Sequence, residues 1–551
     1  MEDLIKTNYI NKEEVEKIKN KYLKQYKITK RKLIKTKKEK EFLKRYKNID
    51  NYINSHNNKF INNLSSKIDI LNNINGYALD EYQKRVVLSE EKASLVIAGA
   101  GSGKSLTIIG KIVYLIKIKK VKPSEILCIS FTNDATKNLE KNIKKNYNYD
   151  IEIYTFHKLA LTILKDNNEK YDIAEDNLLE MVVDNFFENK HNSKIDKIIN
   201  NIKKENRLNK TKRTIITFIN IFKSNNYDIQ KFKEIIKKLS FKNYKENKEI
   251  LILIINIYLS YQHEIEGNNL LDFNDMINKS IKSLKEKGLK RKWKYIIIDE
   301  YQDTSFTKFE LIKSIINLTN ANLLVVGDDF QSIYRFTGCD LNMFLNFNRY
   351  FNHSKIFYIV NTYRNPQELI NVAGSFIMKN KKQQKKNLVS NKHIDKPIKI
   401  YNETNKVKSL KEVLILLKDS KDIMVLGRNN KDINTYIDKD YIKKDEYYIY
   451  KNIRFKYLTI HKSKGLESEN IILINIENSI TGMPTKLVDE DILKYVNNTK
   501  DYFPYEEERR LFYVALTRTK NYVYILNNPD KESVFIKEIK KYKKYVEQIK
   551  R

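Results

Sequence analysis

Apolar and polar residues alternate in blocks along the chain, and these blocks predict a mixed α/β protein. Between residues 77 and 165, short apolar runs at 95–97, 126–130 and 151–154 separate longer stretches with helical periodicity. Short buried runs that alternate with helices are typical of a parallel sheet. The same pattern resumes at 295–298 and 323–326. The sequence therefore predicts one sheet domain that is interrupted in the middle.

The interruption, residues 166–271, differs in composition from its surroundings. It is charged, helical in periodicity and almost free of glycine, so we expect an inserted helical subdomain. Residues 272–345 then complete the first sheet domain.

A second α/β unit is predicted for residues 346–530. Its strands are expected at 355–360, 398–401, 423–426, 457–460, 471–474 and 522–526. Residues 376–395 form a connection rich in Lys, Gln and Asn, and residues 531–551 have the pattern of a basic helix.

The first 76 residues form a basic extension ahead of the sheet domain. Residues 17–47 contain 15 Lys or Arg and two Glu, and their apolar residues recur with rough helical spacing. This predicts one or two basic helices, with a hairpin as one arrangement. A solvated or partly disordered arm is the alternative.

The charge of the whole chain points to a polyanionic partner. The formal net charge is +35, from 104 basic and 69 acidic residues, and nucleic acid is the natural partner for such a balance. The alternative is that an AT-rich genome enriches Lys whatever the function. No apolar run approaches the ~20 residues that cross a membrane. A charged N-terminus without a signal core and only two cysteines lead us to expect a cytoplasmic protein without a membrane partner.

A glycine-rich turn between an apolar run and a helical pattern predicts a phosphate-binding loop. Backbone N–H groups in such a turn point inward at an anion, and the following helix N-terminus adds positive potential. Lys104 can reach the β and γ phosphates of a nucleotide, and the Ser105 hydroxyl can bind Mg²⁺. The first residue departs from the usual glycine. The loop consists of Ala98, Gly99, Ala100, Gly101, Ser102, Gly103, Lys104 and Ser105.

A carboxylate pair follows the apolar run at 295–298. Asp299 at the end of a strand can bind Mg²⁺, and Glu300 can orient the attacking water. An isolated Asp-Glu pair is common on protein surfaces, but here it continues as Tyr-Gln-Asp-Thr-Ser. Together with the glycine-rich turn, it predicts a nucleoside triphosphatase that uses Mg²⁺.

Eight short motifs occur in a fixed order along the chain. They are Leu79–Arg85, Ser130–Asn133, Tyr154–His157, Asp299–Asp303, Gly327–Tyr334, Thr362–Arg364, Thr459–Glu467 and Glu506–Arg518. Their order and spacing resemble the UvrD/Rep branch of superfamily 1 helicases over residues 55–527. Within that branch, residues 326–338, residues 155–161 and the basic extension most resemble the helicase IV subfamily. UvrD and Rep usually have Trp and Arg where this chain has Phe336 and Thr337.

The resemblance implies an α/β fold with two RecA-like P-loop NTPase domains. Domain 1A would comprise 77–165 and 272–345, with 166–271 as a helical 1B-type subdomain, and domain 2A would comprise 346–530. The stretch between Arg364 and Thr459 is too short for a full 2B subdomain as well as the second domain. The 2B subdomain is therefore expected to be reduced or absent.

The resemblance also implies a site for ATP in the cleft between the two domains. Gln83 would recognise adenine, Tyr363 would stack on the base, and Glu467 would contact the ribose. Residues from motifs later in the chain would meet the γ-phosphate. These are Gln331 as a sensor and Arg364 and Arg518 as arginine fingers from the second domain.

A groove for single-stranded DNA is implied by the same motifs. Phe131, Tyr334 and Phe336 are candidates for stacking on bases, although Phe131 and Tyr334 could instead be core residues. The remaining candidates lie in motifs that face the strand in relatives, and His461 has a structural hydrogen bond as its alternative role. They are Thr132, Thr155, His157 and His461.

The implied function is an ATP-dependent motor that moves 3′ to 5′ on single-stranded DNA and opens duplex junctions. DNA repair, replication or recombination is the expected setting, and a monomer is expected when the protein is free. The alternative is a remodelling ATPase that binds RNA polymerase, or another protein, through residues 1–76. A helicase subunit of a nuclease is disfavoured, because no clustered carboxylates follow residue 530.

Overall fold

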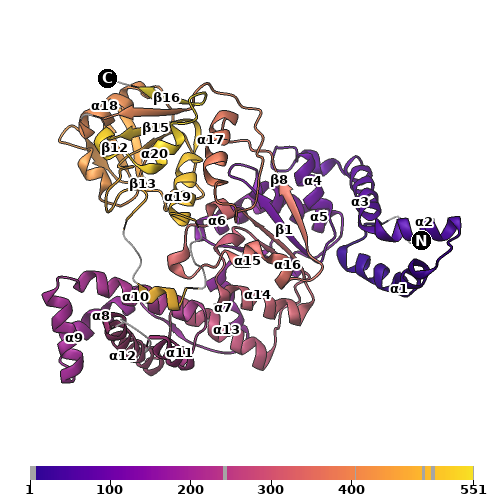
Figure 1. Cartoon of the computed structure of the whole chain (residues 1–551), viewed down its shortest axis with the longest axis horizontal. Coiled ribbons are helices and arrows are strands. Elements are labelled where there is room, and N and C mark those ends of the chain that lie inside the picture. Colours follow the sequence, from indigo (N-terminus) through magenta and orange to yellow (C-terminus); the bar gives the residue numbers. More distant parts are fainter. Residues whose placement is uncertain (1–7, 240–244, 404, 487–490, 498–502, 550–551) are drawn as a thin grey trace.

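The computed structural model describes residues 8–239, 245–403, 405–486, 491–497 and 503–549. Two large sheets organise these residues, each within an α/β domain (Figure 1). The helical subdomain lies below the second domain in this view, and an N-terminal arm projects to the right. No helix in the described ranges is both long enough and apolar enough to cross a bilayer.

The sheet of the first domain has six parallel strands in the order β3-β2-β6-β7-β1-β8. Residues alternate between its two faces, so Leu95 and Ile97 enter one apolar cluster while Val96 and Ala98 enter the other. The strands are β1 (Ala93–Ala98), β2 (Ile126–Ser130), β3 (Glu152–Thr155), β6 (Tyr295–Ile298), β7 (Asn322–Gly327) and β8 (Lys355–Ile359).

Helices cover both faces of this sheet, as expected for parallel strands joined by crossovers. One face carries α4 (Glu81–Leu88), α5 (Lys104–Lys117) and α6 (Asn133–Tyr147). The other carries α7 (Phe156–Asp166), α13 (Phe273–Lys287), α14 (Phe306–Thr319), α15 (Asn342–Leu345) and α16 (Phe347–Tyr350).

The boundary predicted between residues 345 and 346 is wrong. Residues 355–360 were expected in the second unit, but β8 pairs in parallel with β1 at the edge of the first sheet. Hydrophobic pattern predicts that a strand exists without identifying its partner, because either sheet can accept an apolar edge strand. The first domain therefore extends to the end of β8.

The helical subdomain has its own apolar core, which includes Phe218, Phe222 and Ile254. Its helices are α8 (Leu178–Glu188), α9 (Ser193–Lys204), α10 (Leu208–Ser224), α11 (Ile229–Leu239) and α12 (Lys245–Gly267), and the short strands β4 (Asp172–Ile173) and β5 (Leu270–Leu271) pair at its base. A short helix from the second domain, Asp491–Tyr495, reaches this core with Ile492 and Leu493.

The sheet of the second domain has eight strands in the order β11-β12-β13-β10-β14-β15-β9-β16. Its strands are β9 (Ile398–Asn402), β10 (Ile423–Gly427), β11 (Ile442–Lys444), β12 (Tyr447–Tyr450), β13 (Ile453–Thr459), β14 (Ser468–Leu473), β15 (Thr519–Asn527) and β16 (Val546–Ile549). Its helices are α17 (Gln367–Ile377), α18 (Lys406–Leu416), α19 (Glu506–Leu516) and α20 (Val534–Ile539). Apart from residue 404, which lies outside the described part, the stretch 365–458 contains no inserted helical bundle.

The expectation of one basic helix over residues 531–551 is also wrong. The chain forms the short helix α20 and then β16, which pairs in parallel with β9. Phe535, Ile536, Ile539 and Val546 are buried in the core of the second domain. Tertiary burial of these apolar residues overrides the helical tendency of the lysines around them.

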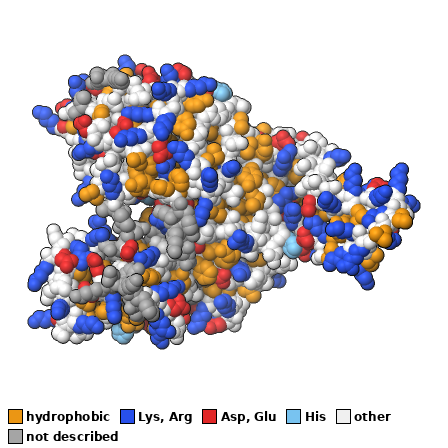
Figure 2. Space-filling view, viewed as in Figure 1, with side chains coloured by type: hydrophobic (Ala, Val, Ile, Leu, Met, Phe, Trp, Pro, Cys, Tyr) orange, Lys and Arg blue, Asp and Glu red, His pale blue; other side chains and the backbone are white. Residues whose placement is uncertain are grey.

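The N-terminal arm contains α1 (Lys12–Arg31), α2 (Lys37–Lys47) and α3 (Ile49–Ser65). The first two form a hairpin in which Tyr26 stacks on Tyr46 with ring centroids 4.3 Å apart. Lys and Arg side chains gather on this arm (Figure 2). The hairpin expected from the sequence is therefore present.

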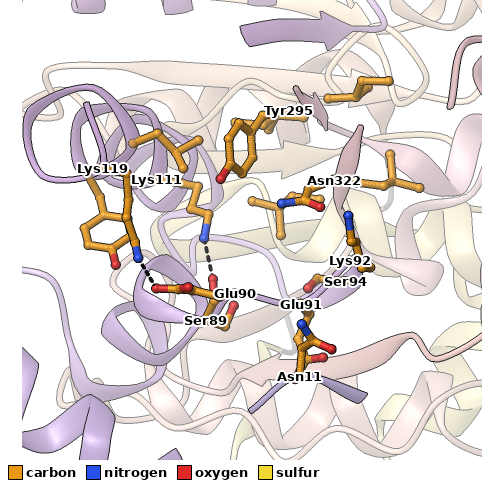
Figure 3. A pocket seen from close by; sticks show the side chains of 16 residues that line it. Asn11, Ser89, Glu90, Glu91, Lys92, Ser94, Lys111, Lys119, Tyr295 and Asn322 are labelled. Atoms are coloured by element: carbon orange, nitrogen blue, oxygen red, sulfur yellow. Dashed lines mark hydrogen bonds and ion pairs between the residues drawn. The ribbon is translucent and has the colours of Figure 1, made fainter. Parts of the chain in front are cut away.

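The arm is fixed to the first domain through the buried carboxylate of Glu91. The Tyr9 hydroxyl donates to Glu91 at 2.6 Å, and the backbone N–H of Lys12 donates to it at 2.8 Å. The Lys355 ammonium of β8 lies 3.5 Å from the same carboxylate. The attachment borders a cavity of about 140 Å³, lined by polar residues that include Glu90 and Lys111 (Figure 3). The arm is thus attached to the first domain by buried polar contacts.

Candidate active site

The predicted nucleotide residues meet at one edge of the first sheet. All its strands are parallel, so the turns that follow β1, β6 and β7 come together at their carboxyl ends. The glycine-rich turn follows β1, the carboxylate pair follows β6, and Asp328 follows β7. The topology explains why motifs far apart in sequence form one site.

The glycine-rich turn needs two of its glycines for backbone reasons. Gly101 and Gly103 have φ values of +71° and +75°, in the left-handed region that side chains disfavour. A side chain at Gly99 would also clash with Leu388, and one at Gly101 would clash with Arg364. Residues of the second domain therefore lie directly against this turn.

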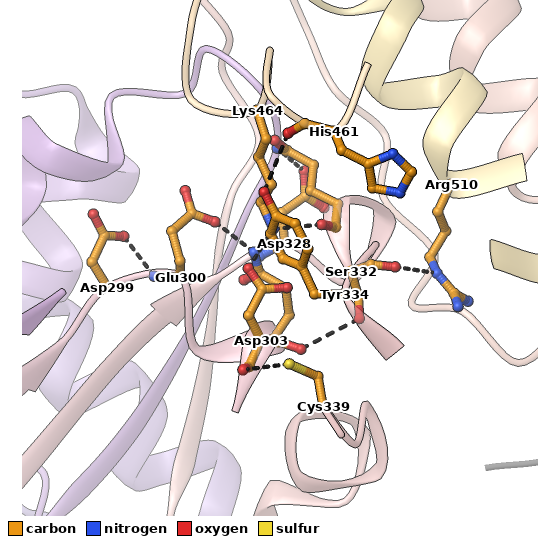
Figure 4. Close-up of polar contacts among 12 residues, drawn as sticks. Asp299, Glu300, Asp303, Asp328, Ser332, Tyr334, Cys339, His461, Lys464 and Arg510 are labelled. Atoms are coloured by element: carbon orange, nitrogen blue, oxygen red, sulfur yellow. Dashed lines mark hydrogen bonds and ion pairs between the residues drawn. The ribbon is translucent and has the colours of Figure 1, made fainter. Parts of the chain in front are cut away.

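The lysine and the carboxylate pair are in direct contact. Lys104 Nζ lies 2.9 Å from Glu300 Oε1. Asp299 accepts the backbone N–H of Glu300 at 2.9 Å (Figure 4). Burial alone would raise the pKa of Glu300, but the charges of Lys104 and Lys464 outweigh it and lower that pKa. Burial and the neighbouring Glu300 raise the pKa of Asp299. Glu300 thus fills the anion position that a phosphate would take on Lys104.

The chemistry of these residues fits Mg²⁺ and a nucleotide. Mg²⁺ is usually bound by one or two protein groups together with phosphate oxygens, and Ser105 and Asp299 supply such groups. Ser102 is 1% exposed, and its hydroxyl has no hydrogen-bond partner in the described structure. The described residues contain no group of three or more His, Cys, Asp or Glu that could hold a metal ion.

Gln83 lies beneath the turn. Its Nε2 donates to the Ser102 carbonyl at 3.1 Å, and its Oε1 accepts the backbone N–H of Asp80 at 3.0 Å. Both ends of the amide are therefore engaged, and adenine recognition by Gln83 stays a prediction. Tyr363 is 61% exposed beside it, with its hydroxyl donating to Asp80 at 2.7 Å. An exposed ring at this position is available for stacking.

The two arginines converge from the opposite side of the interface. Arg364 follows β8 of the first sheet, but its guanidinium contacts the second domain at Glu467, 2.8 Å away. Arg518 is 1% exposed, and its Nη2 donates to Gln331 Oε1 at 3.1 Å. Burial and repulsion from Arg364 lower the pKa of Arg518 to about 9. The buried Arg518 beside a second guanidinium forms a site that favours an anion. Glu467 binds Arg364 and Lys520 here, and its contact with ribose stays a prediction.

Lys464 lies in the motif Thr459–Glu467 but was not among the predicted site residues. Its ammonium donates to the Gln331 carbonyl at 2.7 Å and forms an ion pair with Asp303. It also lies 4.9 Å from the centroid of the Tyr334 ring (Figure 4). The sequence signal that could have identified Lys464 was its position close to His461, which is predicted to face the DNA strand. Lys464 links the nucleotide residues to the predicted strand residues.

One group of predicted strand residues forms an aromatic cluster. The Phe336 ring is 5.8 Å from the His461 ring and 6.2 Å from the Tyr334 ring, measured between centroids. Phe336 is 53% exposed, whereas the Tyr334 hydroxyl donates to the His461 carbonyl at 3.2 Å. The turn after Phe336 packs Gly338 against Ser224 of the helical subdomain. Phe336 thus lies where the three parts of the molecule meet.

A second group lies on the first domain alone. Thr132 and Thr155 cap the N-termini of α6 and α7 through their hydroxyls. Phe131 is partly buried and packs edge-on against Phe156, 5.2 Å away between centroids. The hydroxyls and this ring therefore have structural roles here, and contact with DNA stays a prediction.

His157 of the same group contacts a ring that the sequence reasoning missed. Its ring lies 4.8 Å from that of Phe273, which is 48% exposed at the start of α13. An aromatic residue at the junction between the helical insertion and the first domain was the available signal. Burial lowers the pKa of His157 and of His461 to about 4, so both are neutral at pH 7.

Family models match both domains. The model described as the UvrD/REP helicase N-terminal domain matches residues 79–352, and the one described as the UvrD-like helicase C-terminal domain matches residues 442–529. Together the two matches cover more than half of the chain.

Curated relatives are helicases by name. DNA helicase IV of Escherichia coli is 25% identical over 516 residues, which is 87% of this chain and 72% of that protein. PcrA of Bacillus subtilis is 29% identical over 56% of this chain, and Rep of Buchnera aphidicola is 30% identical over 62%. The chain matches only 41% of that PcrA and 49% of that Rep, so it spans less than half of their length.

Proposed function

The chain belongs to the UvrD/Rep helicase family, and from this premise we propose that it is an ATP-driven motor on single-stranded DNA. It moves 3′ to 5′ and separates the strands at duplex junctions. The match to DNA helicase IV extends over more of this chain than the matches to PcrA and Rep, which supports placement near the helicase IV subfamily. DNA repair, replication or recombination is the proposed setting, and the free protein is a monomer.

The observation that carries the proposal is that charged groups of both domains meet at one interface. Lys104 and Glu300 belong to the first domain, and Arg518 reaches Gln331 from the second. Arginine fingers neutralise charge on the transferring phosphoryl group, so hydrolysis requires the two domains to be together. Product release then lets them separate. Lys464 joins this region to the Tyr334 ring, which supports coupling of the cycle to the DNA strand.

In the proposed cycle the nucleotide displaces Glu300 from Lys104. Lys104 then binds phosphate, and the freed Glu300 carboxylate orients the attacking water. Ser105 and Asp299 would hold Mg²⁺, which neutralises charge on the phosphates when it is bound. Arg364 leaves Glu467 to reach the γ-phosphate. Both rearrangements exchange an ion pair within the protein for one with the nucleotide.

The test compares ATP hydrolysis with single-stranded DNA, duplex DNA, RNA and no nucleic acid. Stimulation by single-stranded DNA is expected, together with strand separation on a duplex that has a 3′ tail. A duplex with only a 5′ tail is the matched control. Hydrolysis that no nucleic acid stimulates, or opening of the 5′-tailed duplex alone, would contradict the proposal.

A second function is favoured by the tip of the arm. Leu33 and Ile34 lie in the turn between α1 and α2, fully and 91% exposed respectively. An exposed apolar pair at the end of a basic hairpin suits insertion into a protein pocket. Remodelling of RNA polymerase through the arm is therefore the second candidate. Co-purification of RNA polymerase with the wild type, and its loss in Leu33→Ser/Ile34→Ser, would support it.

A further inference from the structure

The polar connection after α17 lies against the nucleotide site. We refer to its residues 383–390 as the strap. Leu388 contacts Gly99 of the glycine-rich turn, and the Val389 carbonyl accepts the backbone N–H of Thr362 at 2.9 Å. At the other end, the backbone N–H of Gln384 donates to Asp329 at 2.9 Å. The strap thus connects the phosphate turn, the segment that leads to Arg364 and the turn that contains Gln331.

Lys386 is the buried cation of this strap. Its side chain is 3% exposed, and its ammonium forms ion pairs with Asp328 and Asp329, whose side chains are fully buried. The ammonium also lies 3.9 Å from the centroid of the Phe330 ring. Buried charges persist only when they are paired and hydrogen-bonded. The two carboxylates therefore depend on this lysine, which comes from the second domain.

The Asp328 carboxylate also orients Gln331, the predicted γ-phosphate sensor. Asp328 Oδ2 accepts Gln331 Nε2 at 2.7 Å, which leaves Gln331 Oε1 to accept from Arg518 at 3.1 Å. A hydrogen-bonded chain thus runs from Lys386 through Asp328 and Gln331 to Arg518. Each link fixes the orientation of the next group.

We propose that Lys386 is a positioning residue for ATP hydrolysis: it fixes Asp328, and through it holds Gln331 and Arg518 in register with the γ-phosphate. The inference rests on the proposed function, because it assigns Gln331 and Arg518 to the γ-phosphate. Lys386 belongs to the second domain, whereas Asp328 and Gln331 belong to the first. The lysine therefore lets the second domain control the sensor of the first.

The direct test is Lys386→Met, which keeps the length of the side chain and removes its charge. We expect kcat for ATP in the presence of single-stranded DNA to fall about tenfold or more, with KM changed about threefold at most, because orientation is lost while nucleotide contacts remain. Lys385→Met is the matched control, since Lys385 is the exposed neighbour on the same strap. It should keep wild-type kcat and KM.

A second variant separates positioning from folding. Removing Lys386 alone leaves two buried carboxylates, so Lys386→Met/Asp329→Asn lowers the uncompensated charge and should recover thermal stability. If Lys386 positions the sensor, the double variant stays defective in kcat although it is stable. Recovery of kcat together with stability would overturn the proposal, because the role would then be structural.

The proposed function and this inference fail in different ways. A wild-type protein without DNA-stimulated hydrolysis contradicts the proposed function. A wild type with that activity and a folded Lys386→Met variant with unchanged kcat contradicts only the role of Lys386. An increase in KM alone would make Lys386 a binding residue, which also overturns the proposal.

Discussion

At the scale of single residues, Glu300 has two successive partners in the proposed cycle, which are Lys104 before ATP binds and the attacking water afterwards. In the structure it neutralises Lys104 at 2.9 Å, and Gln302 also donates to it. A buried lysine without an anion would be costly, so the carboxylate keeps the site stable before ATP arrives. The same carboxylate is then free to orient water once phosphate takes its place.

Glu300→Gln should bind ATP and hydrolyse it about 10²-fold more slowly or worse, because the amide cannot orient and activate water as a carboxylate does. Steady-state hydrolysis and nucleotide affinity are the measurements. Glu286→Gln, an exposed carboxylate on α13, is the control and should keep wild-type turnover. Near wild-type turnover in Glu300→Gln would transfer the role of orienting water to another group.

Arg518→Ala should lower kcat about 10³-fold while ATP affinity changes little, because an arginine finger acts on charge that develops in the transition state. Relief of the repulsion between the two guanidinium groups should also help Arg364 to keep its contact with Glu467. Single-turnover kinetics separate binding from chemistry. A higher KM with unchanged kcat would make Arg518 a binding contact only.

Two half-buried histidines, His157 and His461, predict a dependence of stability on pH. Burial lowers the pKa of His157 and His461 from 6.5 to about 4, so between these values the unfolded chain binds more protons than the folded one. Their contribution therefore falls as pH decreases from about 6.5 towards 4. The Tm should drop from pH 7 to pH 5.5, and His157→Gln/His461→Gln should show a smaller drop. An equal drop in both proteins would assign it to other groups.

At the scale of secondary-structure elements, hydrophobic pattern predicted the parallel strands of the first sheet but not which sheet each strand joins. The run at 355–360 is a strand, yet β8 joins β1 because pairing is decided by tertiary contacts. The prediction of one basic helix over residues 531–551 failed for a similar reason, since Val546 packs in the core as part of β16. Burial across the chain, rather than local propensity, determined both outcomes.

The residues of the candidate site could be predicted from the sequence only in part. The motifs that follow β1 and β6 bring Lys104 and Glu300 together, because these parallel strands end at one edge, whereas Arg518 directly precedes β15 and comes from the second domain. Lys386 could not be found this way, since it lies in a polar connection with no periodicity and its partners are more than fifty residues distant. A lysine in a Lys-rich connection gives no sign of burial.

The short helical turn at Arg335–Thr337 carries Phe336, the exposed aromatic residue that we predict to contact DNA. Phe336→Ala should weaken binding of single-stranded DNA about 5- to 150-fold, the equivalent of ~1–3 kcal/mol for one stacked base, and should spare hydrolysis without DNA. Phe336→Trp should retain binding, because a larger ring still stacks. Tyr52→Ala, an exposed aromatic on α3, is the control. Thermal destabilisation by Phe336→Ala would instead indicate a packing role.

At the scale of the whole molecule, the two α/β domains, the helical subdomain and the arm are joined at a few defined contacts. The short helix at Asp491–Tyr495 anchors the second domain to the helical subdomain, and Asn225 donates to the Val496 carbonyl there at 3.2 Å. Glu91 anchors the arm to the first domain, at the opposite end of the strands from the nucleotide turn. We therefore predict that the arm takes no part in the chemistry and acts through what it binds.

The arm can meet phosphates with its charge or a protein with its apolar tip, and two variants separate these roles. In Lys24→Gln/Lys27→Gln/Lys37→Gln/Lys38→Gln, four exposed lysines of the hairpin lose their charge while the Tyr26–Tyr46 stack and the Glu91 anchor remain. Each DNA phosphate that the hairpin no longer neutralises should flatten the slope of log affinity against log salt by ~0.9 on duplex DNA. The variant Leu33→Ser/Ile34→Ser changes no charge, so its slope should equal that of the wild type.

An unchanged slope in the lysine variant, with hydrolysis retained, would exclude the arm as a DNA-binding surface. Loss of a protein partner in the Leu33→Ser/Ile34→Ser variant would then assign the arm to docking.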